Sequence, residues 1–174
     1  MRDAAPPYRG EGPHALWHVS EDDSIRRFEP RDGRVWAIDT RHLPLYWFPR
    51  DCPRATFWAD TATSDEDVGR FLGGDRGLRA HVVEPEWLPR LHATQVVSYR
   101  MPEATFVQDD DRFWISYKPV EPLEVVPLGD LVVRHEAAGI ELTTEPRLLA
   151  FWDTVVRSTL GFSGIRLGNA RMSA

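Results

Sequence analysis

The sequence predicts a single-domain α+β fold with a mostly antiparallel or mixed sheet, split or strongly bent, and helices packed outside it. Short apolar runs rich in β-branched and aromatic residues follow one another with few long connections between them. Parallel strands need crossovers of a dozen or more residues, so a doubly wound parallel sheet is disfavoured. Apolar residues make up 42% and charged residues 28% of the chain, as in ordinary globular proteins.

The first half of the chain contains four predicted strands, because each run is short, apolar and bounded by turn residues. Residues 40–48, interrupted by Pro44, are expected to form a short helix or an irregular turn. Residues 49–54 hold two prolines and are predicted to be a loop, since proline breaks a helix interior. The four strands are predicted at residues 15–20, 34–39, 55–60 and 78–85.

A helix is predicted at residues 63–74. Thr63 or Ser64 can cap its start, acidic residues fill the first turn, and a Gly-Gly pair ends it. Residues 84–94 are expected to form a short helical or turn segment.

The second half alternates less clearly between the two kinds of element. Strands are expected at residues 95–102 and 105–110, and one more within residues 111–128. Two helices follow, each expected to end at a glycine, and the C-terminal tail is expected to add a short extended piece. The helices are predicted at residues 128–142, ending at Gly139, and at residues 145–162, the longest, ending at Gly161.

Composition narrows the classes of partner. Net charge is −6, so a basic nucleic-acid-binding face is not expected. No apolar run approaches the roughly 20 residues of a membrane span.

Residues 1–14 are rich in Pro and Gly and are expected to be a disordered arm before one domain at residues 15–174. Cys52 is the single cysteine, which excludes an internal disulfide; we expect a cytoplasmic protein and leave its oligomeric state open.

Several common chemistries are excluded by the motifs that the chain lacks. It has no glycine-rich nucleotide loop of the usual spacings, no HExxH, no pair of CxxC motifs and no GxSxG elbow. Its six histidines are scattered along the sequence. No metal ion is therefore expected.

One spaced pattern remains. His18 lies in the first predicted strand, Tyr46 stands thirteen residues after Gly33, and the β-type run 114–117 is followed by Val120-Glu121-Pro122. This pattern resembles the three signatures of the ADP-ribosyltransferase fold in its His-Tyr-Glu branch, typified by poly(ADP-ribose) polymerases. The resemblance implies an ADP-ribosyltransferase-like sheet with an NAD pocket.

The resemblance also implies roles for individual residues. His18 would hold a ribose hydroxyl, and Tyr46 would stack on the nicotinamide ring. The glutamate that stabilises developing positive charge in that family falls on Phe113 here. Asp111 or Glu121 would have to replace it, so NAD binding is better supported than transfer. The residues expected to bind the cofactor are His18, Ser20, Tyr46, Arg54 and Tyr117.

A further branch of that fold, the RNA 2'-phosphotransferases, lacks the glutamate and relies on arginines and histidines. Arg50, Arg54 and Arg166 could serve in a similar way.

At closer range, most of the chain is similar to a bacterial family of short uncharacterised proteins, a similarity that brings no known activity. The motifs that carry it here are LWHVSE, VWAID, PRDCPR, PVEPL and STLGF.

Three functional hypotheses follow. The first is an NAD- or nucleotide-binding pocket that transfers ADP-ribose with His18 and either Asp111 or Glu121 as catalytic residues. The second is a non-catalytic small-ligand-binding or accessory protein. The third is hydrolysis or transfer on another nucleotide-like substrate through arginines and histidines.

Overall fold

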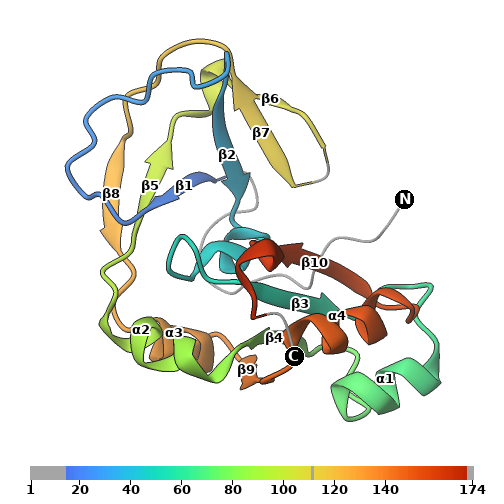
Figure 1. The fold of residues 1–174 in the computed structure, drawn as a ribbon. Coiled ribbons are helices and arrows are strands. Elements are labelled where there is room, and N and C mark those ends of the chain that lie inside the picture. Colours follow the sequence, from blue (N-terminus) through green and yellow to red (C-terminus); the bar gives the residue numbers. More distant parts are fainter. Residues whose placement is uncertain (1–14, 111, 172–174) are drawn as a thin grey trace. The chain divides into compact units, whose positions relative to one another are not determined.

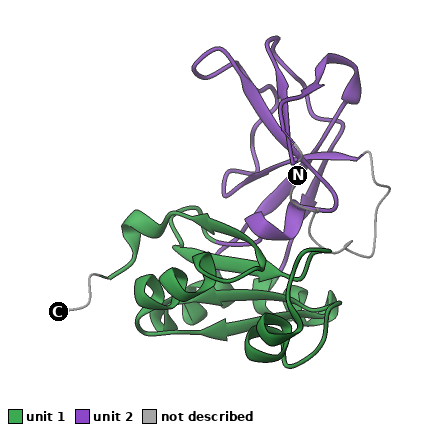
Figure 2. Cartoon of the chain, turned by 90° about the vertical axis from the view of Figure 1, so that its right-hand side faces the viewer, with its two compact units in different colours: residues 1–6, 49–93, 130–174 green, residues 7–48, 94–129 purple. Residues whose placement is uncertain are grey.

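A computed structural model describes residues 15–110 and 112–171. The backbone divides into two compact units, coloured separately in Figure 2. Among the described residues, unit 1 comprises 49–93 and 130–171, and unit 2 comprises 15–48, 94–110 and 112–129. The expected arm at residues 1–14 lies outside the described residues, and the expectation of one domain over residues 15–174 stays a prediction.

Unit 2 is built on a six-stranded sheet in which every neighbouring pair is antiparallel, in the order β6-β7-β2-β1-β5-β8 (Figure 1). Two short 3-10 helices, η1 (Leu43–Tyr46) and η3 (Glu103–Thr105), lie in its connections. The strands are β1 (Leu16–Ser20), β2 (Val35–Asp39), β5 (Val97–Met101), β6 (Val107–Gln108), β7 (Phe113–Ser116) and β8 (Glu124–Pro127).

One face of this sheet forms the core of unit 2. Side chains alternate between faces along a strand, and residues paired across two strands share a face. Phe28 and Val120, which bridge to each other outside the strands, pack on this face. The buried side chains of this core are Leu16, Phe28, Val35, Ala37, Val97, Tyr99, Met101, Phe106 and Val120.

Unit 1 is built on a four-stranded sheet in the order β10-β3-β4-β9, where β4 and β9 are parallel and the other pairs antiparallel (Figure 1). Its strands are β3 (Arg54–Trp58), β4 (Arg79–Val83), β9 (Ile140–Thr144) and β10 (Gly161–Ile165). Its helices are α1 (Asp65–Leu72), α2 (Leu88–Ala93), α3 (Leu131–Ala137) and α4 (Leu148–Val156), with 3-10 turns η2 (Pro85–Trp87) and η4 (Leu167–Asn169).

The two faces of the unit 1 sheet differ in polarity. Phe57 and Ala80 are register partners on one face, where side chains of α1 and α4 complete an apolar core. Thr56 and His81 are register partners on the other face. Every residue of β3 and β4 is buried, so neither face of these two strands meets solvent. The alternation of side chains along them therefore separates an apolar buried face from a more polar buried face.

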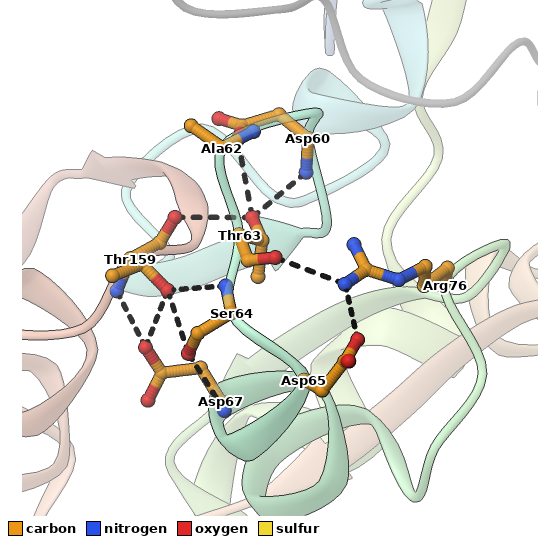
Figure 3. A network of polar contacts seen from close by, with 8 residues as sticks. All are labelled: Asp60, Ala62, Thr63, Ser64, Asp65, Asp67, Arg76 and Thr159. Atoms are coloured by element: carbon orange, nitrogen blue, oxygen red, sulfur yellow. Dashed lines mark hydrogen bonds and ion pairs between the residues drawn. The ribbon is translucent and has the colours of Figure 1, made fainter.

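A network of polar contacts ties the start of α1 to the turn after α4 (Figure 3). Ser64 caps α1 by accepting a hydrogen bond from Asp67 N. The Thr159 hydroxyl donates to Asp67 Oδ2 at 2.5 Å and accepts from Ser64 N at 2.9 Å. Hydrogen bonds from Thr159 hold the pKa of the Asp67 carboxyl below its usual value. Thr159 of the STLGF motif therefore joins two segments that are 92 residues apart.

The α+β prediction, with its split sheet, is confirmed, and so are the first four strands and the α1 helix with its Ser64 cap and its Gly73 end. None of the helices in the described ranges is long and apolar enough to cross a membrane.

The helix predicted to stop at Gly139 does so, because α3 ends at Ala137 and Gly139 follows with a φ of +67°, but β9 begins at Ile140, inside the predicted range 128–142. Two other element predictions in the second half are wrong. The helix predicted at residues 145–162 covers only α4, and Gly161, expected to end it, is the first residue of β10. Residues 111–128 hold two strands, β7 and β8, instead of one.

Candidate functional site

Tyr46 lies in η1, directly after β2, and its ring contacts Phe113 at the start of β7. The two ring centroids are 6.3 Å apart and the rings are nearly perpendicular at 78°. Phe113 is the residue that stands where the resembling family has its glutamate. Tyr46, which the sequence predicts by its spacing from Gly33, therefore has an aromatic ring and not a carboxylate at this contact.

Trp36 extends this contact along the same face of the sheet. Its ring meets Phe113 edge to face with centroids 5.8 Å apart. Trp36 pairs with Ile115 and Phe113 with Ile38 across β2 and β7, so the rings share the face opposite the unit 2 core. The Trp36 side chain is 39% exposed, and those of Tyr46 and Phe113 are half-buried.

Two arginines stand over these rings. The guanidinium carbon of Arg34 is 5.4 Å from the Trp36 ring centroid, and that of Arg112 is 5.5 Å from the Phe113 ring centroid. Both distances fall within the range of a cation–π interaction. We call Arg34, Trp36, Tyr46, Arg112 and Phe113 the aromatic–arginine surface.

This arrangement can hold a ligand that combines a planar ring with a negatively charged group such as phosphate. Aromatic rings offer stacking surfaces to any base, and each guanidinium offers planar, charged donors that match phosphate. The five side chains come from β2, η1, β7 and their flanking residues, so the sheet fixes their spacing.

His18 lies on the other face of the same sheet. It pairs with Tyr99 across β1 and β5, and its ring centroid is 4.7 Å from that of Phe28, a member of the core. Its Nδ1 lies 2.8 Å from the Trp36 carbonyl oxygen, to which Nδ1–H donates. The structure thus gives His18 and Tyr46 different aromatic neighbours on opposite faces and does not bring them together.

Of the remaining predicted site residues of unit 2, Ser20 is half-buried, and Tyr117 and Glu121 are exposed. The Ser20 hydroxyl accepts a hydrogen bond from Asp22 N at 3.1 Å. Tyr117 is 66% exposed. Glu121 makes an ion pair with Arg27 at 3.4 Å on the surface. Asp111 lies outside the described residues.

Arg54 belongs to unit 1, in the first position of β3. It is buried, and its Nη1 donates to the Cys52 carbonyl oxygen at 2.9 Å. Burial raises the pKa of the Cys52 thiol to about 12, against a smaller opposing effect of Arg54. A thiol with such a pKa is protonated at neutral pH and is a poor nucleophile.

Four of the five members of the aromatic–arginine surface are not among the site residues that the sequence predicts: Arg34, Trp36, Arg112 and Phe113. In the sequence, Phe113 marks only the place of a missing glutamate, and Trp36 is only part of a predicted strand. The alternation in VWAID was the available signal: if Val35 and Ala37 face a core, Trp36 must point away from it. An exposed tryptophan on a strand is a stronger indication of binding than a buried one. Within the described ranges, no group of three or more His, Cys, Asp or Glu side chains could hold a metal ion.

The fold and this surface define an α+β protein with two sheets and a partly exposed aromatic patch. The chain belongs to a family of unknown function, DUF6886, whose model matches residues 17–170. No curated protein and no solved structure matches it.

Proposed function

We propose that this protein binds a small nucleotide-like ligand on the aromatic–arginine surface of unit 2. The observation that carries the proposal is the chain of edge contacts from Tyr46 through Phe113 to the 39% exposed Trp36, with an arginine over each of the last two rings. A base or a nicotinamide ring would stack on the indole, and a phosphate would pair with Arg34 or Arg112.

NAD is the ligand that the sequence resemblance favours, and Tyr46 is the residue that both lines of reasoning share. The proposed partner is a small molecule in the cytoplasm rather than a nucleic acid or a membrane, in keeping with a net charge of −6. Because Phe113 stands where the family has its glutamate, the geometry supports binding without catalysis better than it supports ADP-ribosyl transfer.

Transfer of ADP-ribose is the narrower proposal. It requires a carboxylate near the stacked ring, which Asp111 or Glu121 would have to provide, and His18 would have to approach from the other face of the sheet. Nicotinamide release from NAD measures this reaction directly. Equal release by Glu121→Gln and Asp111→Asn variants and by the unchanged protein would remove both carboxylates from the proposal.

The binding proposal is tested by titrating the protein with NAD, ADP-ribose, AMP and nicotinamide and following the thermal unfolding midpoint and ligand NMR signals. Trp36→Ala should weaken binding about tenfold or more, since stacking on one aromatic side chain contributes about 1–3 kcal/mol. Arg34→Gln should weaken the binding of the ligands that carry phosphate and leave the binding of nicotinamide unchanged.

Arg70→Gln is the matched control, because Arg70 lies over Phe71 in unit 1 with the same kind of cation–π contact at 4.8 Å. Unchanged affinity in Trp36→Ala, or an equal loss in Arg70→Gln, would exclude the surface as the binding site.

A further inference from the structure

Two polar side chains of β5 lie on the face of the unit 2 sheet opposite the core, and each has a buried atom that makes no hydrogen bond. Val97, Tyr99 and Met101 belong to the core, so Ser98 and Arg100 point to the other face. Ser98 is only 1% exposed, and its hydroxyl has no hydrogen-bond partner among the described residues. Nε of the half-buried Arg100 is also buried and has none.

The guanidinium of Arg100 is positioned by a neighbouring strand. In the sheet, β5 is an inner strand between β1 and β8 (Figure 1). Arg100 pairs with Trp17 of β1, which shares its face, and its guanidinium carbon lies 5.4 Å from the centroid of that ring. The Trp17 indole is buried and donates from Nε1 to Thr40 Oγ1 at 2.9 Å. The cation therefore lies beside a fixed ring, within the range of a cation–π interaction.

One carboxylate faces this cation from the strand on the other side. Glu124 of β8 is the register partner of Arg100 and shares its face. The Glu124 side chain is exposed, and no ion pair joins it to Arg100 in the part of the chain that the structure describes. Arg100 is thus a half-buried cation without an ion pair there, and removing a charge from water is costly unless an anion compensates it.

The two buried atoms can be satisfied together by one acceptor with a negative charge. Residues i and i+2 of a strand point to the same face about 7 Å apart, so one small group can reach both side chains. Nε–H of Arg100 can only donate, and the Ser98 hydroxyl can donate as well. A carboxylate has two coplanar oxygens for Nε–H, Nη–H and the hydroxyl, and it also neutralises the cation. A water molecule would accept the hydrogen bonds without neutralising the charge.

The other neighbours of Ser98 on this face are apolar. Val19 of β1 and Val126 of β8 are its register partners, and both are half-buried. Hydrocarbon therefore stands on both sides of the hydroxyl. Small-ligand sites combine a mostly apolar lining with a few polar groups, so a short apolar chain attached to the carboxylate suits these neighbours.

We infer that Ser98 and Arg100 form a binding site for the carboxylate of a small monocarboxylic acid with a short apolar chain. The site lies on the same face as the aromatic–arginine surface but is separate from it. Trp36 belongs to β2, and β1 with the buried Trp17 lies between β2 and β5. The inference does not rest on nucleotide binding, and its ligand needs neither a phosphate nor an aromatic ring.

The test uses butyrate on the full chain at pH 7, with butyramide as the uncharged counterpart of the same shape. Titration calorimetry and ligand NMR signals measure the binding at constant ionic strength. We expect a dissociation constant of about 1 mM or below for butyrate. Butyramide should bind at least tenfold more weakly, because its neutral head group cannot form an ion pair with the guanidinium.

Four variants test the residues of the site. Arg100→Gln should weaken butyrate binding at least tenfold, and Ser98→Ala about three- to tenfold. Glu124→Gln should tighten it about twofold or more, because the substitution removes a negative charge that repels the ligand. Arg90→Gln is the matched control and should leave the affinity unchanged, because Arg90 is an exposed arginine of unit 1 that lies over Trp87 at 4.1 Å.

Equal binding of butyrate and butyramide would overturn the inference. So would an unchanged affinity in Arg100→Gln or Ser98→Ala, or a weaker one in Glu124→Gln.

Should the substitutions prevent folding, ¹⁵N NMR of the arginine side chains decides the matter on the unsubstituted protein. Butyrate should shift the Nε–H resonance of Arg100, and butyramide should leave it in place. A resonance that butyrate does not move would overturn the inference. Each of these results leaves nucleotide binding by the aromatic–arginine surface untouched, because that test uses different ligands and variants.

Discussion

The two units place arginine in opposite environments. In unit 1, Arg54 and Arg79 are buried on one face of the four-stranded sheet. In unit 2, Arg34 and Arg112 stand over partly exposed aromatic rings beside the six-stranded sheet. A buried charge depends on every neighbour that compensates it, whereas an exposed charge is solvated by water.

The difference indicates where the molecule tolerates change. Both faces of β3 and β4 are covered, so substitutions there should cost stability. The face of unit 2 that carries Trp36 is partly open, so substitutions there should alter ligand binding at little cost to folding. The predictions below test this contrast in order of decreasing effect.

The largest effect is expected in the apolar core of unit 1. Phe57 is 2% exposed and packs against Phe71 and Phe151 at centroid distances of 6.0 and 5.9 Å. Phe57→Ala should lower the free energy of unfolding by about 3–5 kcal/mol, because it leaves a cavity. Phe113→Ala in unit 2 is the matched change at a half-buried ring and should cost about 1–2 kcal/mol. Urea unfolding measures both, and equal losses would contradict the contrast between the units.

Acid should destabilise the protein through His81 and His135. Burial lowers their pKa values in the folded chain below those in the unfolded chain, so the unfolded chain binds more protons and stability falls as the pH falls. The contribution is fully present above the unfolded value near 6.5 and is lost progressively down to about 4, the pKa of His135. The loss should be on the order of 3 kcal/mol for that residue alone.

Urea unfolding at intervals from pH 7 to pH 4 measures this loss. His92→Gln provides the control, because His92 is a half-exposed histidine that pairs with Asp130. A free energy of unfolding that stays constant between pH 7 and pH 5 would show that the buried histidines are not held neutral.

The smallest effect is expected at the network of Figure 3. Thr159→Val removes the hydroxyl that joins Asp67 to Ser64 and should cost about 1 kcal/mol, because the network is exposed to water. It should also raise the pKa of Asp67 toward its usual value, which carboxylate NMR measures. Thr154→Val removes a hydroxyl that bonds only within α4 and should leave that pKa unchanged. An unchanged pKa of Asp67 in the Thr159→Val variant would show that the Thr159 hydroxyl does not lower that pKa.

Much of unit 1 could be read from local patterns. Ser64 caps α1 and Gly73 ends it with a φ of +59°, as a left-handed C-terminal glycine does. The strand β9 could not be read in this way, because Ile140–Thr144 follows a helix after two residues and its partner β4 lies about 60 positions earlier. Pairing with a distant strand, rather than local propensity, makes this segment extended.

The candidate site was only partly within reach of the sequence. Its spacing from Gly33 predicts Tyr46 as a site residue, and the structure gives it an aromatic neighbour in Phe113. The same resemblance predicts Glu121 and Tyr117, but both are exposed side chains away from the core. Spacing along a chain does not say on which face of a sheet a residue lies, and a register shift of one residue reverses that face.

The sequence by itself determined the α+β class, most of the strands, the start and end of α1 and the membership of DUF6886, because turn residues, caps and alternation act over a few neighbouring positions. Only the tertiary structure decided that Arg54, Arg79, His81 and His135 gather on one buried face and that Trp36 and Phe113 meet on another. Those groupings depend on which distant strands pair and in which register, and the free energy of burial that selects the register belongs to the whole fold.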